Sequence, residues 1–161
     1  MITFSHLSRN WSRPCASSTL VLANVSGIQR GIAAVPEALV VLVVEDEWLL
    51  HAPIEEALVT GGFKPVFVGS GEEASSLLRS VSNYSALVTD VTLRDEMRGW
   101  QLATLAREIN PELPVVYMTA ASAAEWAAHG VPNSILLQKP FAPAQLVTAV
   151  SQLLNKNTPA T

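Results

Sequence analysis

Three acidic residues stand together at the end of an apolar run. Residues 38–44 read ALVVLVV, and Glu45, Asp46 and Glu47 follow directly. Neighbouring carboxylates repel one another, and the repulsion is strongest at the edge of a low-dielectric core. A positive group is therefore expected nearby, and the identity of that group decides the chemistry of the site.

Further reactive side chains end other apolar runs of the chain. Asp90 ends YSALVTD, Thr119 lies near the end of LPVVYMTA, and Lys139 lies near the end of SILLQKPF. If these runs are neighbouring parallel strands, their ends meet at one edge of a sheet, where ligands bind in such folds. Three carboxylates would then meet one ammonium and one hydroxyl.

One lysine does not neutralise three carboxylates. A hard divalent cation does, and a ligand set of oxygens without His or Cys favours Mg²⁺ over Zn²⁺. An aspartate beside such a cation is suited to attack phosphorus and form an aspartyl phosphate. Lys139 would then neutralise one phosphoryl oxygen, and Thr119 would donate a hydrogen bond to another.

The elements that must position these residues alternate along the chain. Short β-branched apolar runs predict five strands, at residues 38–44, 64–70, 84–90, 113–120 and 134–141. Helical spacing of apolar residues predicts helices within 47–63, 72–81, 99–110, 122–130 and 142–156. This alternation predicts an α/β fold with three layers, in which a doubly wound parallel sheet carries helices on both faces.

Two local signals refine the helix starts. Pro53 fits the first helix only if that helix begins late or bends, because proline lacks the N–H of a helix interior. Ser70 with Glu73 three residues later forms a capping box for the second helix.

Composition limits the class of protein. The chain has 161 residues, 49% of them hydrophobic and 15% charged, which predicts one globular domain. A net charge of −4 argues against a nucleic-acid-binding surface. Cys15 is the single cysteine, so no internal disulfide is possible, and a reducing compartment is consistent with that. No apolar run reaches the roughly 20 residues needed to cross a bilayer.

Residues 1–36 differ from the rest of the sequence. They contain no Asp or Glu and only three basic residues, Arg9, Arg13 and Arg30. We interpret them as a flexible extension or a translated upstream segment. A signal peptide or an organellar transit peptide is the alternative.

The motifs VLVVEDE, ALVTDV, VVYMTA and QKPF, in this order and spacing, resemble the receiver domain of two-component response regulators over about residues 38–155. The resemblance implies the flavodoxin-like strand order 2-1-3-4-5, with a domain at 37–156, an extension at 1–36 and a short tail at 157–161. It also implies that a histidine kinase phosphorylates Asp90. By the same resemblance, Mg²⁺ is held by Glu45, Asp46, Asp90 and the backbone carbonyl of Thr92.

The resemblance gives roles to three further residues. Thr119 corresponds to the switch hydroxyl that turns toward the phosphoryl group, and Lys139 to its salt-bridging partner. Pro140 lies where the family commonly has a cis peptide bond.

The sequence departs from the family pattern in two regions. Leu136 stands where the family usually has Tyr or Phe, which puts the usual threonine–aromatic coupling in doubt. Arg94 stands where proline is usual, and Gly99 follows Asp90 by nine positions, one more than expected. The loop after Asp90 is therefore expected to differ in shape. Ala121 flanks the phosphoryl pocket in the family and has no group to orient an attacking water.

The leading hypothesis is a stand-alone cytoplasmic phosphorylation switch, without enzymatic activity beyond self-catalysed phosphotransfer and autodephosphorylation. Its expected partners are a histidine kinase or histidine phosphotransfer protein and a downstream protein in trans. DNA and membranes are not expected, and a homodimer is possible.

Two other functions remain open. One is a Mg²⁺-dependent small phosphatase, although haloacid-dehalogenase-like enzymes usually carry a second Asp two positions after the nucleophile, where this chain has Thr92. The other is an interaction module that keeps the fold without phosphorylation, which Leu136 and the unusual loop suggest.

Overall fold

The computed structural model describes residues 38–80, 83–94, 96–120 and 123–156. The expected extension at 1–36 and tail at 157–161 lie outside these described residues. Strands and helices alternate in the order β1 (Leu39–Val44), α1 (His51–Thr60), β2 (Phe63–Val68), α2 (Gly71–Ser80), β3 (Ala86–Asp90), α3 (Gly99–Ile109), β4 (Val115–Thr119), α4 (Ala123–His129), β5 (Ile135–Gln138) and α5 (Pro143–Lys156).

The five strands form one parallel sheet in the order β2-β1-β3-β4-β5. The predicted fold class and strand order are thus confirmed. The register pairs Val44 with Thr89, Asp90 with Met118, and Thr119 with Gln138. The carboxyl ends of β1, β3, β4 and β5 therefore reach the same edge of the sheet.

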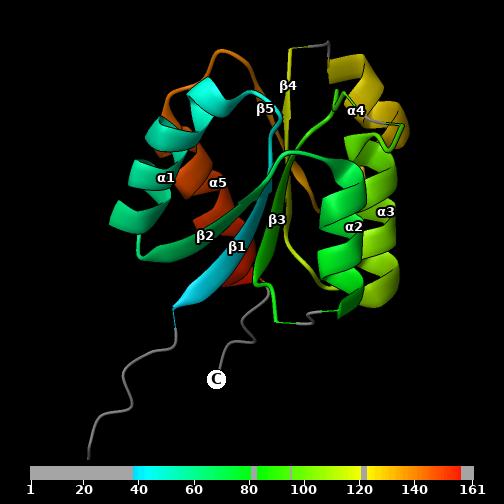
Figure 1. Cartoon of the computed structure of the whole chain (residues 1–161), viewed down its shortest axis with the longest axis horizontal. Helices are drawn as coiled ribbons and strands as arrows, with labels where there is room; N and C mark the ends of the chain where they lie inside the picture. The colour runs from blue at the N-terminus through cyan, green and yellow to red at the C-terminus, as the bar shows by residue number, and fades with distance from the viewer. Residues whose placement is uncertain (1–37, 81–82, 95, 121–122, 157–161) are drawn as a thin grey trace, which may run out of the picture. The chain divides into compact units, whose positions relative to one another are not determined.

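Helices cover both faces of the sheet (Figure 1). Helices α1 and α5 lie on one face, and α2, α3 and α4 lie on the other. Each face has its own apolar core, because side chains alternate along a strand. The first core packs Ile54 and Leu58 of α1 and Leu146 of α5 on the sheet, and the second packs Leu78 of α2 and Leu102 of α3.

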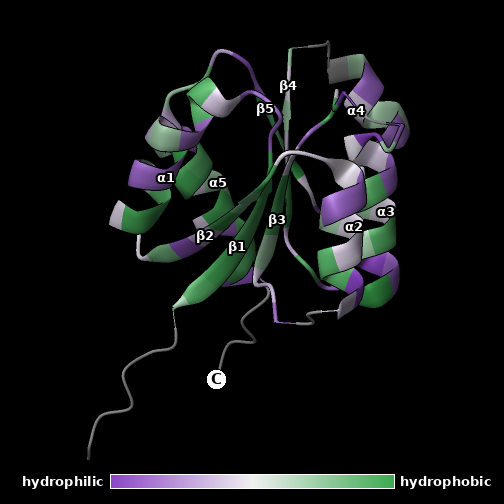
Figure 2. Ribbon diagram, in the orientation of Figure 1, coloured by the Kyte–Doolittle hydropathy of each residue, from purple (hydrophilic) through white to green (hydrophobic). Residues whose placement is uncertain are grey.

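The central strands are apolar throughout, which fits strands covered on both faces. Figure 2 shows this as hydrophobic colour along β1 and β3. All five residues of β3 and of β4 are buried, and so are the last four of β1. Asp90 and Thr119 end β3 and β4, so the apolar strands carry these polar residues to the edge of the core.

The residue at which α1 begins explains how the helix accommodates Pro53. A single 3₁₀ turn spans Trp48–Leu50, and α1 begins at His51. Pro53 thus lies in the first turn of α1, where a helix needs no N–H donor. The prediction that this helix begins late is confirmed.

The cap of α2 is present as well, since the Ser70 hydroxyl accepts a hydrogen bond from the Glu73 N–H at 3.1 Å. Within the described residues, no helix is long and apolar enough to cross a membrane.

Candidate functional site

Three carboxylates converge at the carboxyl edge of the sheet. Glu45 and Asp46 directly follow β1, and Asp90 is the last residue of β3, the neighbouring strand. One oxygen from each carboxylate lies within 4.8 Å of the others. Glu45 is completely buried and Asp90 is only 7% exposed, so water provides little screening of their repulsion. The sequence prediction that these three residues meet is confirmed.

Lys139, one residue beyond β5, joins this cluster. Its Nζ lies 2.7 Å from Glu45 Oε2 and 2.5 Å from Asp90 Oδ2. Burial alone would lower the pKa of Lys139, but the hydrogen bonds to Asp90 and Glu45 outweigh it and raise this pKa above its ordinary value. Lys139 is therefore a fixed positive charge between two acids.

The surroundings of Glu45 compensate its buried negative charge only in part. Burial raises the pKa of Glu45, and the hydrogen bond from Lys139 opposes that rise without cancelling it. Lys139 does not cancel the rise because its single ammonium is shared between the carboxylates of Glu45 and Asp90. The Glu47 N–H adds a hydrogen bond to Glu45 Oε1 at 3.2 Å. The expectation that a single lysine does not neutralise the cluster is consistent with this geometry.

Asp46 faces solvent and has a different cationic partner. Arg94, on the loop after β3, places its Nε 2.7 Å from Asp46 Oδ2. The Arg94 side chain is 82% exposed, whereas that of Asp46 is 14% exposed. Sequence reasoning singled out Arg94 as a departure from the family pattern but did not predict this ion pair.

The backbone around Asp90 fixes its carboxylate. The Thr92 N–H donates a hydrogen bond to Asp90 Oδ1 at 2.8 Å, so the backbone of Thr92 lies at the site. Ligation of a cation by the Thr92 carbonyl stays a prediction.

Gly99 closes the loop that follows Asp90. Its N–H donates to the Val91 carbonyl at 3.2 Å. A Cβ added at Gly99 would clash with the Asp90 carbonyl oxygen, so no side chain fits there. The sequence marked Gly99 only by its spacing, and its close approach to the backbone of Asp90 is a finding of the structure.

Thr119 and Lys139 are linked through the backbone. Thr119 is 2% exposed, and its carbonyl accepts a hydrogen bond from the Lys139 N–H at 2.7 Å. The Lys139–Pro140 peptide bond is cis, as the resemblance implied. Thr119 thus lies beside the cluster, while its role as a switch hydroxyl stays a prediction. Ala121 lies outside the described residues.

His51, the first residue of α1, contacts the end of β1. Its Nε2 lies 2.8 Å from the Glu45 carbonyl oxygen, and its ring stacks on Phe67 with centroids 4.6 Å apart. His51 therefore ties the first turn of α1 to the end of β1. No sequence pattern indicated this contact.

The face of the sheet near Leu136 carries an aromatic side chain on the neighbouring strand. Leu136 is half-buried and pairs in register with Tyr117, which is completely buried on β4. The Tyr117 hydroxyl accepts a hydrogen bond from the Val131 N–H at 3.2 Å, and Trp100 packs on its ring at 4.5 Å. Tyr117 therefore connects β4 to the segment that follows α4.

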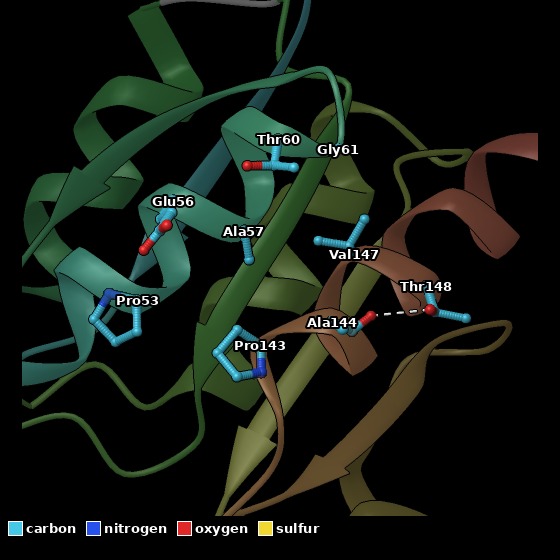
Figure 3. Close-up of a pocket in the computed structure, with 9 residues that line it drawn as sticks. All are labelled: Pro53, Glu56, Ala57, Thr60, Gly61, Pro143, Ala144, Val147 and Thr148. Carbon is cyan, nitrogen blue, oxygen red and sulfur yellow. Dashed lines mark hydrogen bonds between the residues drawn. The ribbon is translucent and has the colours of Figure 1, made fainter.

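Two shallow cavities lie beside α1. The first, about 540 Å³ in volume, lies between α1 and α5 and is lined by residues such as Pro53, Ala57 and Val147 (Figure 3). The second, about 570 Å³, is lined by Lys139, Phe141 and again Pro53. The two cavities share Pro53 and Pro143 as lining residues.

The donor set fits one class of metal ion. All three side chains that converge offer carboxylate oxygens, and this cluster, as found among the described residues, contains no His or Cys. Hard divalent cations such as Mg²⁺ prefer such oxygens, whereas Zn²⁺ favours nitrogen and sulfur. Fold and site together define an α/β protein of flavodoxin-like topology with a candidate cation and phosphoryl site at the carboxyl edge of its sheet.

Comparison with known proteins identifies the family. The family model for the response regulator receiver domain matches residues 41–151, and the chain belongs to this family. A response regulator receiver protein from Sinorhizobium medicae WSM419, solved by crystallography, is 46% identical with a TM-score of 0.72. The match covers 74% of this chain and 96% of that chain.

Curated relatives have lower sequence identity to this chain than the Sinorhizobium medicae protein has. The response regulator receiver protein CpdR of Brucella abortus is 29% identical over 71% of this chain and 95% of its own length. The response regulator protein FleR of Pseudomonas aeruginosa is 34% identical, but the match covers only 24% of FleR. The chain spans from about a quarter to about half the length of the first curated relatives that it matches.

One more solved structure shares the fold. The receiver domain of the sensor histidine kinase PA1611 from Pseudomonas aeruginosa is 24% identical with a TM-score of 0.64, over 74% of this chain and 99% of that chain. The PA1611 receiver domain has a magnesium ion coordinated in its active site cleft.

Proposed function

We propose that this protein is a phosphorylation switch that accepts a phosphoryl group on Asp90 from a phosphohistidine. The observation that supports this most is the convergence of Glu45, Asp46 and Asp90 with Lys139 hydrogen-bonded to Asp90. Membership in the receiver domain family supports the same assignment.

In the proposed reaction, a carboxylate oxygen of Asp90 attacks phosphorus. The P–O bond forms as the P–N bond to the donor imidazole breaks, and the imidazole leaves with the electron pair of that bond. Lys139 already contacts Asp90 and is charged, so it would neutralise an oxygen of a phosphoryl group carried by Asp90. Thr119, at the end of the next strand, would donate its hydroxyl to another phosphoryl oxygen.

The same carboxylates are proposed to hold Mg²⁺. Glu45, Asp46, Asp90 and the Thr92 carbonyl would supply the ligands, and the fold relative PA1611 contains magnesium in its own cleft. A bound Mg²⁺ would neutralise charge that develops on the transferring phosphoryl group. Because Glu45 is buried and only partly compensated, a second cation also relieves repulsion within the protein.

The donor is proposed to be a histidine kinase or a histidine phosphotransfer protein in the cytoplasm, and the reader of the switch a downstream protein in trans. A donor must approach the edge of the sheet where Asp90 lies. Trp48 and Leu49 are 74% and 59% exposed, and they follow Asp46 and Glu47 directly. Large exposed apolar side chains at that place suit an interface with a protein partner.

The test is phosphorylation by a small donor. Purified protein incubated with acetyl phosphate and Mg²⁺ should gain the mass of one phosphoryl group, and Asp90→Asn should gain none. Chelation of Mg²⁺ should abolish the gain in the wild type. Labelling of the Asp90→Asn variant at another residue, or no labelling of the wild type, would contradict the proposal.

A second candidate, a phosphate-independent interaction module, is favoured by Leu136 and by the hydrogen bond that already holds Tyr117 to Val131. Binding of beryllofluoride, which mimics a phosphoryl group on Asp90, distinguishes the switch from the interaction module. If it binds at Asp90 but changes neither tryptophan fluorescence nor sedimentation, the module is preferred over the switch.

A further inference from the structure

Arg94 and Lys139 make different kinds of ion pair with the acid cluster. Lys139 bridges the two more buried acids, Glu45 and Asp90, and its own side chain is 17% exposed. Arg94 pairs with Asp46 alone, from a side chain that is 82% exposed. Lys139 is therefore a permanent part of the site, whereas Arg94 reaches it from the solvent side.

Asp46 is the most exposed of the three carboxylates, because its side chain is 14% exposed, that of Asp90 is 10% exposed and that of Glu45 is completely buried. Arg94 holds one of its oxygens at 2.7 Å. A divalent ion bound by Asp46 would lie close to this guanidinium and would be repelled by it. Ion binding and the Arg94–Asp46 pair therefore oppose each other.

We propose that Arg94 is an internal competitor for the cation at Asp46, which weakens the affinity of this receiver for Mg²⁺. In the ion-free state the guanidinium supplies the positive charge that Asp46 lacks. When the ion binds, the guanidinium swings toward solvent, which costs little because most of it is exposed already. Arg94 thus sets the Mg²⁺ concentration at which the site fills with the ion that phosphorylation of Asp90 is proposed to need. This inference rests on the proposed function, since it concerns the same cation site.

The size of the effect follows from the kind of ion pair. An exposed pair contributes about 0–1 kcal/mol, so removing the competitor should tighten divalent cation binding up to about fivefold. The effect should also depend on salt, because an exposed guanidinium is screened within about 3 Å at 1 M ionic strength and within about 10 Å at 0.1 M.

The test compares Arg94→Gln with a matched variant in the same loop. Arg98→Gln removes the same charge, and Arg98 is an exposed residue that takes part in none of the ion pairs found among the described residues. Dissociation constants are measured with Mn²⁺ as the probe, by the electron paramagnetic resonance signal of the free ion, and then with Mg²⁺ by displacement. No phosphoryl donor is needed.

We expect Arg94→Gln to bind Mn²⁺ and Mg²⁺ about two- to fivefold more tightly than the wild type at low salt, with the difference shrinking at 1 M salt. Arg98→Gln should differ from the wild type by much less. The inference would be overturned if Arg94→Gln bound the two ions with the affinity of the wild type. It would also be overturned if Arg94→Gln and Arg98→Gln gained affinity for the ions by the same factor. Asp46→Asn in the same titration distinguishes the two proposals: if the wild type binds neither ion, or Asp46→Asn binds as tightly as the wild type, the cation site itself fails.

Discussion

The Lys139 ammonium lies 2.7 Å from the carboxylate of Glu45, a residue without any solvent exposure, and the two residues are 94 positions apart in the chain. A buried carboxylate needs such a partner, because desolvation of an unpaired charge is costly. The pair therefore joins the end of β1 to the end of β5 for structural as well as chemical reasons.

The first prediction concerns this pair. Lys139→Met leaves Glu45 and Asp90 buried without their cation, and we expect the free energy of unfolding to fall by about 3 kcal/mol. Urea unfolding measures the loss. Adding Glu45→Gln to Lys139→Met should recover part of it, because the added change removes one uncompensated charge. Equal stability of the wild type and Lys139→Met would show that the pair has no structural role.

Gly99 provides a second prediction. In Gly99→Ala the new methyl would clash with the Asp90 carbonyl oxygen, so the backbone must shift, at a cost of about 1–3 kcal/mol. Thermal unfolding and the rate of labelling by acetyl phosphate should both decrease. Gly69→Ala is the matched control, because a Cβ there meets nothing within 4 Å. Similar losses in both variants would contradict the argument.

The third prediction concerns pH. Burial raises the pKa of Tyr117 and that of Tyr84, and these are the two tyrosines of the chain. Ultraviolet titration of the folded protein should give midpoints above the ordinary value of about 10. The folded protein keeps the two tyrosine hydroxyls protonated to a higher pH than the unfolded chain does. The contribution of the two tyrosines to stability is therefore fully present below about pH 10 and is lost as the pH rises through their folded-state pKa.

Tyr117→Phe isolates one of the two tyrosines. It removes the Tyr117 transition from the titration and leaves the Val131 N–H without its acceptor, which we expect to cost about 1 kcal/mol. Tyrosine midpoints at the ordinary value in the native protein would contradict the burial argument.

The fourth prediction concerns docking of the donor. Trp48→Ala should lower the affinity for a phosphohistidine donor protein about tenfold, the loss expected when about 1.4 kcal/mol of apolar contact disappears. Labelling by acetyl phosphate should not change, because Trp48 is 74% exposed and none of the ion pairs of the acid cluster involves it. Val59→Ala, at an exposed position near the end of α1, is the control. If Trp48→Ala slows both donors equally, Trp48 supports the fold rather than the interface.

Sequence patterns predicted most of the fold because each element carries its own signal. The apolar run before Glu45 and the run that ends at Asp90 both became central strands, with bounds that differ from prediction by one or two residues. The meeting of Glu45, Asp46, Asp90 and Lys139 was predictable because parallel strands bring their carboxyl ends to one edge.

Contacts made by loops and by side-chain rotamers had no such signal. The pairing of Arg94 with Asp46 and the contact of His51 with the Glu45 carbonyl depend on where a loop or a helix start lies in space. The hydrogen bond of Tyr117 to Val131 likewise joins two segments whose spacing carries no periodicity. These are the places where tertiary geometry, rather than local pattern, decides the partner.

The hydrogen bond from the Gly99 N–H to the Val91 carbonyl brings together the two ends of the segment that follows Asp90. Inside this closed segment Thr92 holds the Asp90 carboxylate and Leu93 is buried, whereas Arg94 is exposed, so the residue at position 94 can change without displacing Asp90. Exchanging that one residue for its counterpart in a homologous protein should therefore retune the cation affinity of the site while the rest of the domain stays as it is.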